Sequence, residues 1–280
     1  MKKISRRSFL AAAAVSAAAL ALTACGGSAS TASSAASSVA ASSEAASTSA
    51  AAAELTTVEA GKLTMATNAT FPPYEMTTDA GTIEGIDVDT AQAIAEKLGL
   101  ELQIDDMDFD AALLSVQQGK ADIAMAGITV TDERMAVMSF SDSYATGIQS
   151  VIVPEGSDIA SVDDLAGKKI GTQRGTTGYL YCSDDFGEDA VVAYDNGLTA
   201  VQALNNGQVD AVVIDNEPAK AYVESNPGLK ILDTSYAEED YAIGMAKGNT
   251  ALEDAVNAAL EELKADGTLQ SIVDKYITAE

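Results

Sequence analysis

Residues 85–104 of the chain, GIDVDTAQAIAEKLGLELQI, predict a helix followed directly by a strand. Apolar side chains recur at helical spacing from Val88 to Leu98, and Gly99 supplies a typical helix stop. Residues 100–104 then have the pattern of a strand, as residues 62–67 do before the helix. A helix between two strands is the unit from which parallel α/β sheets are built.

The same alternation continues to the end of the chain. Helix-like runs are predicted at residues 109–118, 162–165, 198–205, 218–224, 250–265 and 268–276. Strand-like runs are predicted at residues 122–126, 150–153, 169–172, 191–193, 211–214 and 230–232. Strands that alternate with helices indicate an α/β fold with a largely parallel sheet.

One local pattern occurs twice. A helix ends in Gly119-Lys120-Ala121-Asp122-Ile123, and a later helix ends in Gly207-Gln208-Val209-Asp210-Ala211. In each copy a glycine stop and an aspartate precede a buried strand. The copies lie too far apart for a solenoid repeat, so two similar α/β lobes are the simpler interpretation. The alternative is a turn that any α/β chain reuses.

Composition excludes several classes of protein. The 280 residues include 16 Lys and Arg, 42 Asp and Glu and no His, for a formal net charge of −26. Phosphate contacts need basic clusters, so no nucleic-acid partner is expected. Histidine is the commonest general base and metal ligand, and two cysteines make neither a disulfide scaffold nor a four-cysteine zinc site. We therefore expect no metal, no cofactor and no catalytic residue.

The first residues have the character of an export signal. Basic residues at positions 2–7 precede an apolar run over 9–22, which is shorter than the roughly 20 residues of a membrane span. Residues 5–10 resemble the twin-arginine export motif, although ordinary secretory signals also contain arginine pairs. Leu22-Thr23-Ala24-Cys25 resembles the lipobox of bacterial lipoproteins, in which the cysteine is lipidated. A buried alanine-rich helix is the alternative for this segment.

A polar segment separates this signal from the globular part. Ser, Ala and Thr dominate residues 25–59, and no apolar periodicity is present there. The sequence therefore predicts an export signal over 1–24, a tether over 25–59 that begins at Cys25, and a globular body from about residue 61. The expected location is the extracytoplasmic face of the cell membrane, attached by lipid.

Two charged residues follow predicted strands, where α/β sheets bind ligands. Arg134 comes after the strand at 122–126 and the segment Gly127-Ile128-Thr129, and its guanidinium suits a carboxylate. The alternative is a surface arginine paired with a neighbouring acid. Asp215 ends the strand of the second repeat and suits an ammonium group, or else caps the following helix.

From about residue 62 to 276 the chain resembles family 3 of the bacterial extracellular solute-binding proteins, the polar amino-acid receptors of ABC importers. The residues that carry this resemblance are spread in order along the whole body. They are 66–75, 85–89, 107–109, 127–134, 140–144, 175–178 and 210–215.

The resemblance implies a type II periplasmic-binding-protein fold, with two α/β lobes joined by two crossover strands and a ligand cleft between them. Lobe one is expected at residues 61–145 plus 243–280, and lobe two at residues 149–240. The crossovers near 145–149 and 241–244 are expected to act as hinges for ligand-induced closure, with Gly147 and Gly244 absorbing backbone rotation.

It also implies roles for groups that bind the backbone of a free L-amino acid. Arg134 and the amides of Thr129 and Thr177 are expected to bind the ligand carboxylate. Asp215, the Gly127 carbonyl and the Thr129 hydroxyl are expected to bind the ligand ammonium.

For the ligand side chain, the resemblance implies a sandwich between Phe71 and Phe109, with Asn68 and Gln173 at its tip. Two neutral amides disfavour a strongly charged side chain, so glutamine-like or cystine-like ligands are expected ahead of charged ones. Arginine is the alternative, through cation–π contact with the rings. Its charge would need a partner, for which the candidates are Asp105, Asp106 and Glu75.

The implied partners are the permease and ATPase subunits of an ABC importer and, through the lipid anchor, the membrane. The protein is expected to act as a monomer. Two other functions stay open: a sensory amino-acid-binding module, and an enzyme on the same fold such as a dehydratase. The absence of His and of a nucleophile motif argues against the enzyme.

Overall fold

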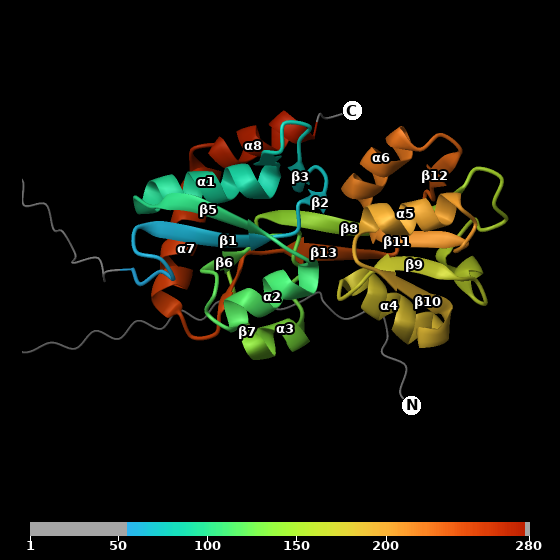
Figure 1. The fold of residues 1–280 in the computed structure, drawn as a ribbon, viewed down its shortest axis with the longest axis horizontal. Coiled ribbons are helices and arrows are strands. Elements are labelled where there is room, and N and C mark those ends of the chain that lie inside the picture. The colour runs from blue at the N-terminus through green and yellow to red at the C-terminus, as the bar shows by residue number, and fades with distance from the viewer. Residues whose placement is uncertain (1–54, 278–280) are drawn as a thin grey trace, which may run out of the picture. The chain divides into compact units, whose positions relative to one another are not determined.

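Two mixed sheets form the centre of the structure, a computed structural model that describes residues 55–277 (Figure 1). The first has the strand order β5-β1-β6-β14-β7, and we call the part built on it lobe one. The second, in lobe two, has the order β10-β9-β11-β8-β12, with β13 also paired to β8. The predicted signal, the lipobox with Cys25 and most of the tether lie outside the described residues.

Each lobe contains the same βαβαβ unit. In lobe one it is β1 (Lys62–Thr67), α1 (Ile86–Leu98), β5 (Glu101–Asp106), α2 (Phe109–Gln117) and β6 (Ile123–Ala124). In lobe two it is β9 (Ile170–Gln173), α4 (Thr177–Phe186), β10 (Val191–Tyr194), α5 (Gly197–Asn205) and β11 (Ala211–Asp215). The first strand lies between the other two, parallel to both, in each unit. The prediction of two similar lobes is therefore confirmed.

The repeated glycine and aspartate have the same conformation and the same hydrogen bond in both lobes. Asp122 Oδ2 accepts a hydrogen bond of 2.8 Å from the Thr64 amide, at the start of β1. Asp210 Oδ2 accepts one of 2.8 Å from the Lys169 amide, just before β9. The glycine three residues before each aspartate has a φ of 64° or 67°, a conformation that favours glycine. Each aspartate thus fixes the third strand of its unit to the first.

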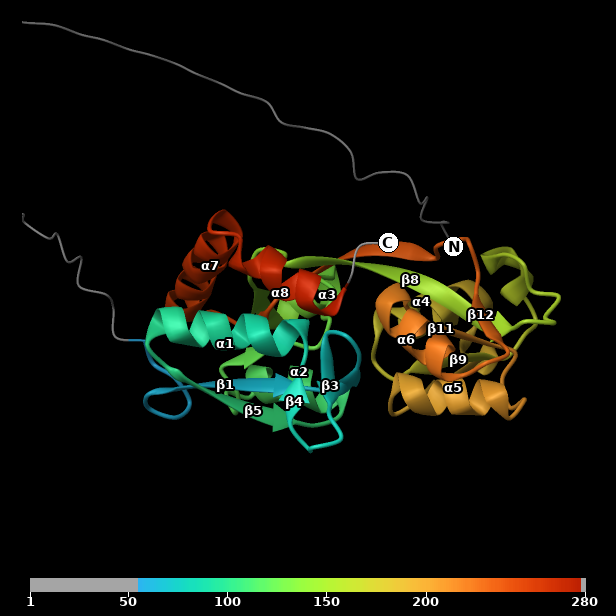
Figure 2. The same cartoon turned by 90° about the horizontal axis from the view of Figure 1, so that it is seen from above.

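The sheets are mixed rather than largely parallel because the chain crosses between the lobes twice. The strands that join antiparallel to their neighbours are β7 (Met138–Phe140), β8 (Ala145–Pro154), β12 (Leu229–Ile231), β13 (Ala237–Tyr241) and β14 (Gly244–Ala246). The long strand β8 and its partner β13 run side by side from one lobe to the other (Figures 1 and 2). The crossover is therefore a hydrogen-bonded ribbon rather than two separate loops.

The remaining elements cover the sheets and the lobe edges. The helices are α3 (Asp132–Val137), α6 (Asn216–Ser225), α7 (Thr250–Ala265) and α8 (Thr268–Tyr276), with 3-10 turns at Val162–Leu165 and Glu188–Ala190. A small sheet contains β2 (Thr70–Phe71), β3 (Glu75–Thr77) and β4 (Ile83–Glu84). Apolar periodicity did not predict α4, because this helix buries few apolar side chains. None of the helices within residues 55–277 has the length and apolar character of a membrane span.

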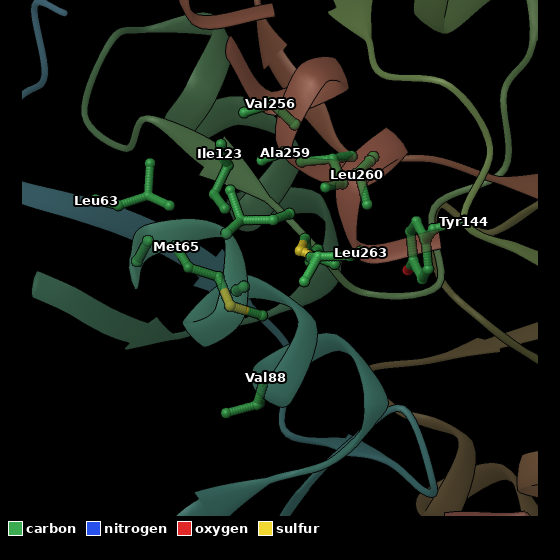
Figure 3. Packing of buried hydrophobic residues seen from close by; sticks show 14 of the residues in the cluster. Leu63, Met65, Val88, Ile123, Tyr144, Val256, Ala259, Leu260 and Leu263 are labelled. Carbon is green, nitrogen blue, oxygen red and sulfur yellow. The ribbon is translucent and has the colours of Figure 1, made fainter. Parts of the chain in front are cut away.

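The core of lobe one explains why its helices form where the apolar periodicity predicts them. Leu63 and Met65 of β1 are fully buried, and Leu260 and Leu263 of α7 belong to the same cluster (Figure 3). Val88 extends this cluster from α1 (Figure 3). Apolar side chains one helical turn apart therefore meet the sheet along a single stripe.

The two crossover glycines serve close packing in this structure. Neither has a positive φ, and Gly147 lies in the paired part of β8 opposite Glu239. A Cβ atom at Gly147 would lie 2.3 Å from Cζ of Tyr241, and one at Gly244 would lie 2.5 Å from the methyl carbon of Met138. The absence of a side chain at Gly147 therefore leaves the space that the Tyr241 ring occupies.

We predict that Gly147→Ala lowers the free energy of unfolding by about 1–3 kcal/mol, because the ring has to move to admit the methyl group. Gly156→Ala is the matched control, since a Cβ atom there meets nothing within 4 Å. Denaturant unfolding of both variants measures the difference. Equal stability of the two variants would contradict the packing role of Gly147.

Candidate functional site

A cavity lies between the lobes and is lined by residues of both. Every residue for which the sequence predicted contact with a bound ligand lines it. These are Asn68, Phe71, Phe109, Gly127, Thr129, Arg134, Gln173, Thr177 and Asp215. The structure therefore brings the predicted set together, from both lobes.

Arg134 is a buried cation without an ionic partner. Its guanidinium donates to the Thr129 carbonyl at 2.8 Å and, in the other lobe, to the Gly175 carbonyl at 3.1 Å. It also lies over the Phe109 ring, 5.4 Å from the centroid. No carboxylate within residues 55–277 comes within ion-pair distance of it, so the alternative of a paired surface arginine does not hold. Burial lowers the pKa of Arg134, and the charge of the nearby Glu239 carboxylate acts in the opposite direction.

Asp215 caps a helix and also lines the cavity. Its Oδ1 accepts from the Glu217 amide at 3.0 Å and so caps α6. Its Oδ2 accepts from the Ile148 amide at 2.9 Å and from the Tyr241 hydroxyl at 3.0 Å. The carboxylate nevertheless lines the cavity, and burial raises its pKa to about 6. These neutral donors orient Asp215 while leaving its negative charge uncompensated.

Gly127 forms part of the cavity wall in a conformation that favours glycine. Its φ is 55°, and a Cβ atom there would lie 2.8 Å from the Phe71 ring. Its amide donates to Asp87 Oδ2 at 3.1 Å. The absence of a side chain at Gly127 leaves room for the Phe71 ring against the backbone.

Thr129 is hydrogen-bonded to a buried acid that the sequence did not predict. Its hydroxyl donates to Glu239 Oε2 at 3.0 Å, and Gln149 Nε2 donates to the same oxygen at 3.0 Å. The Thr129 oxygen also lies 3.4 Å from the Thr177 hydroxyl of lobe two. Glu239 lies on β13 of the crossover, in a run of three acidic residues. No sequence pattern indicates that the middle one of the three is buried.

Asn68 and Gln173 bond to each other across the cavity. Gln173 Nε2 donates to Asn68 Oδ1 at 2.9 Å, and Thr70 Oγ1 donates to the same oxygen at 3.0 Å. Asn68 Nδ2 donates to the Met107 carbonyl at 2.8 Å. The two amides therefore satisfy much of each other's hydrogen bonding, which weakens the argument that they select a neutral ligand.

Glu75 supplies a buried carboxyl group in the cavity. It lines the cavity and is fully buried, and neither of its oxygens accepts a hydrogen bond from residues 55–277. It pairs with Phe71 between β2 and β3, so both side chains point to the same face. Burial and the adjacent charge of Asp87 raise its pKa well above the usual range. Strands of two and three residues are too short for a sequence pattern to orient them.

Comparisons place the chain among known binding proteins. The family model described as bacterial extracellular solute-binding proteins, family 3, matches residues 63–279. A probable histidine-binding protein of Neisseria gonorrhoeae is 34% identical over 222 residues, which cover 77% of this chain and 83% of that protein. A putative ABC transporter arginine-binding protein of Escherichia coli is 32% identical over 79% of this chain and 93% of its own length.

Solved structures of similar proteins have the same fold. An ancestral arginine-binding protein bound to arginine is 43% identical and superposes with a TM-score of 0.74, covering 78% of this chain and 98% of its own. The same ancestral type bound to glutamine is 41% identical with a TM-score of 0.74, covering 79% of this chain and all of its own. The prediction of a two-lobed periplasmic-binding fold is confirmed.

Proposed function

The chain belongs to family 3 of the bacterial extracellular solute-binding proteins, and from that premise we propose that it binds a basic L-amino acid, arginine first, for an ABC importer. The observation that carries this proposal is the fully buried carboxyl group of Glu75 in the same cavity as Arg134 and Asp215. Three ionisable groups without ionic partners match the three charges of arginine.

In this proposal the two charged ends of the ligand backbone contact opposite walls. Arg134 binds the carboxylate, with the amides of Thr129 and Thr177 beside it. Asp215 binds the ammonium, with the Gly127 carbonyl. Thr129 accepts from the ammonium, because its own hydrogen is donated to a buried acid.

The ligand side chain lies between Phe71 and Phe109, which offer flat faces to a guanidinium. Glu75 provides the negative charge that a buried cation requires. The neutral preference predicted from Asn68 and Gln173 gives way to this proposal, because those amides are bonded to each other. Relatives whose names specify histidine and arginine support a basic ligand, and one named for cystine shows the range within the family.

Membership of this family argues against the two alternative functions, a sensory module and an enzyme on the same fold. Its members are described as solute-binding proteins, which supports a binding function rather than a dehydratase. An ABC importer is favoured over a sensory partner because the relatives include ABC transporter proteins by name. The permease and ATPase subunits are therefore the proposed partners of a monomeric receptor.

Calorimetry with arginine, lysine, glutamine and glutamate tests the ligand assignment. We expect arginine to bind most tightly and Arg134→Ala to weaken it by roughly 30- to 5,000-fold, since truncating one partner of a buried charge pair costs roughly 2–5 kcal/mol. Glu75→Gln should weaken arginine more than glutamine. Tightest binding of glutamine or glutamate by the wild-type protein would refute the basic-ligand assignment.

Lobe closure is part of the proposal, because contacts between the lobes surround the cavity. Gln173 bonds to Asn68, and the Tyr222 hydroxyl donates to the Thr70 carbonyl. Ligand-bound protein should keep these contacts, while free protein exchanges with an open form through bending of the crossover ribbon.

We predict that saturating arginine lowers the radius of gyration measured by small-angle X-ray scattering. Arg134→Ala at the same arginine concentration is the control and should show no such change. A radius that stays constant in the wild-type protein while calorimetry records binding would rule out closure.

We also propose that Cys25, which lies outside the described residues, carries a lipid anchor on the extracytoplasmic face of the membrane. One acyl chain binds membranes only marginally, so the multiply acylated cysteine of lipoproteins is the sufficient form. The residues that follow it would act as the tether.

Fractionation of producing cells tests this anchor. Cys25→Ser should move the protein from the membrane to the soluble extracytoplasmic fraction. Cys182→Ser, which alters only a buried thiol, should leave it on the membrane. Retention of the Cys25 variant on salt-washed membranes would contradict the lipid attachment.

A further inference from the structure

Two carboxyl groups meet in a buried position beside the cavity. Glu75 begins β3 and Asp87 lies in the first turn of α1, and both are fully buried. The Asp87 amide donates to the Tyr74 carbonyl at 2.9 Å, which holds the start of α1 against the strand that carries Glu75. Glu75 faces the cavity, whereas Asp87 lies behind it.

The surroundings of the two carboxyl groups differ. Asp87 Oδ1 accepts from the Tyr144 hydroxyl at 2.7 Å, and its Oδ2 accepts from the Gly127 amide at 3.1 Å. The Glu75 oxygens accept from no group within residues 55–277. The two hydrogen bonds favour Asp87 as the ionised member, so a proton held between the two acids would reside on Glu75.

No cation compensates this pair. None of the ion pairs within residues 55–277 involves Glu75 or Asp87. Two neighbouring buried carboxylates do not both ionise, and they titrate as one coupled unit.

We infer that Glu75 and Asp87 share one proton in the free protein, and that a cationic ligand side chain releases this proton while a neutral one leaves it in place. The inference rests on the proposed function, in which Glu75 faces the ligand side chain. With a cationic ligand, the carboxyl O–H bond of Glu75 breaks, the proton passes to solvent, and the resulting carboxylate pairs with the ligand. With a neutral ligand, the protonated Glu75 stays uncharged.

Other titratable groups face the pair from each neighbouring element. Asp106 at the end of β5 and Asp215 at the end of β11 add negative charge, which disfavours ionisation of Glu75 further. The tyrosines around the pair are Tyr74, Tyr144 and Tyr222. Burial raises the pKa of Asp87 and of Asp215 to about 6. Asp215 faces the ligand ammonium, so any amino acid affects its proton, and only a comparison between ligands isolates Glu75.

Arginine and citrulline provide this comparison. They share the α-amino-acid end and nearly the same shape, but citrulline has a neutral urea in place of the guanidinium. Calorimetric titration in two buffers of different ionisation enthalpy gives the number of protons released with each ligand. At pH 5.5–6.5 we expect arginine to release about one proton more than citrulline.

The pH dependence of affinity gives a second readout. The ratio of arginine affinity to citrulline affinity should rise with pH by up to about tenfold per unit, because the cation binds the deprotonated pair. The ratio should become constant above the pH at which the free pair has lost its proton.

Two variants control the experiment. Glu75→Gln should abolish the difference in proton release while still binding citrulline. Glu84→Gln removes a carboxylate from the adjacent strand β4, outside the cavity, and should keep the difference. Circular dichroism and the binding of citrulline confirm that each variant is folded.

The outcomes separate this inference from the proposed function. Equal proton release with arginine and citrulline by the wild-type protein between pH 5 and pH 8, with arginine still bound, would overturn the shared proton and leave the proposed function intact. Binding of citrulline without binding of arginine would overturn both. The wild-type measurement decides the question even if Glu75→Gln fails to fold.

Discussion

The site depends on a buried cation that has no carboxylate within ion-pair distance among residues 55–277. The guanidinium of Arg134 is buried among carbonyl groups and an aromatic ring, and it draws those carbonyls from both lobes. Burial of an unpaired charge costs on the order of several kcal/mol, which partial hydrogen bonding only reduces. Asp215 repeats the arrangement with opposite sign, oriented by two amides and a hydroxyl. Neither of these two buried charges has an ionic partner within residues 55–277.

The duplicated architecture explains why the two charges face one another. In each lobe a βαβαβ unit ends in a strand whose carboxyl end points at the cavity, which is where α/β sheets bind ligands. Arg134 follows β6 of the first unit, and Asp215 ends β11 of the second. Asp122 and Asp210 occupy equivalent positions and fix β6 and β11 to their neighbouring strands. The same local structure therefore precedes both Arg134 and Asp215.

Sequence patterns predicted the regular part of this arrangement well. Apolar periodicity predicted α7 and α8 at their observed bounds, and the family motifs predicted nine of the residues that line the cavity. Local patterns could not orient Glu75, which stands on a three-residue strand, or Glu239, whose burial depends on the ribbon formed by β8 and β13. They also missed the close packing of Gly147 on Tyr241, since that contact joins residues distant in sequence.

The position of β14 has a consequence for how the chain is assembled. This strand lies between β6 and β7 in the first sheet, yet it follows the whole of lobe two in sequence. Before the chain returns, β6 and β7 have no strand to join them, whereas lobe two draws its parallel unit from one contiguous segment. Lobe two therefore interrupts lobe one in sequence, and a fragment that ended before lobe two would lack the strand that joins β7 to the rest of its sheet.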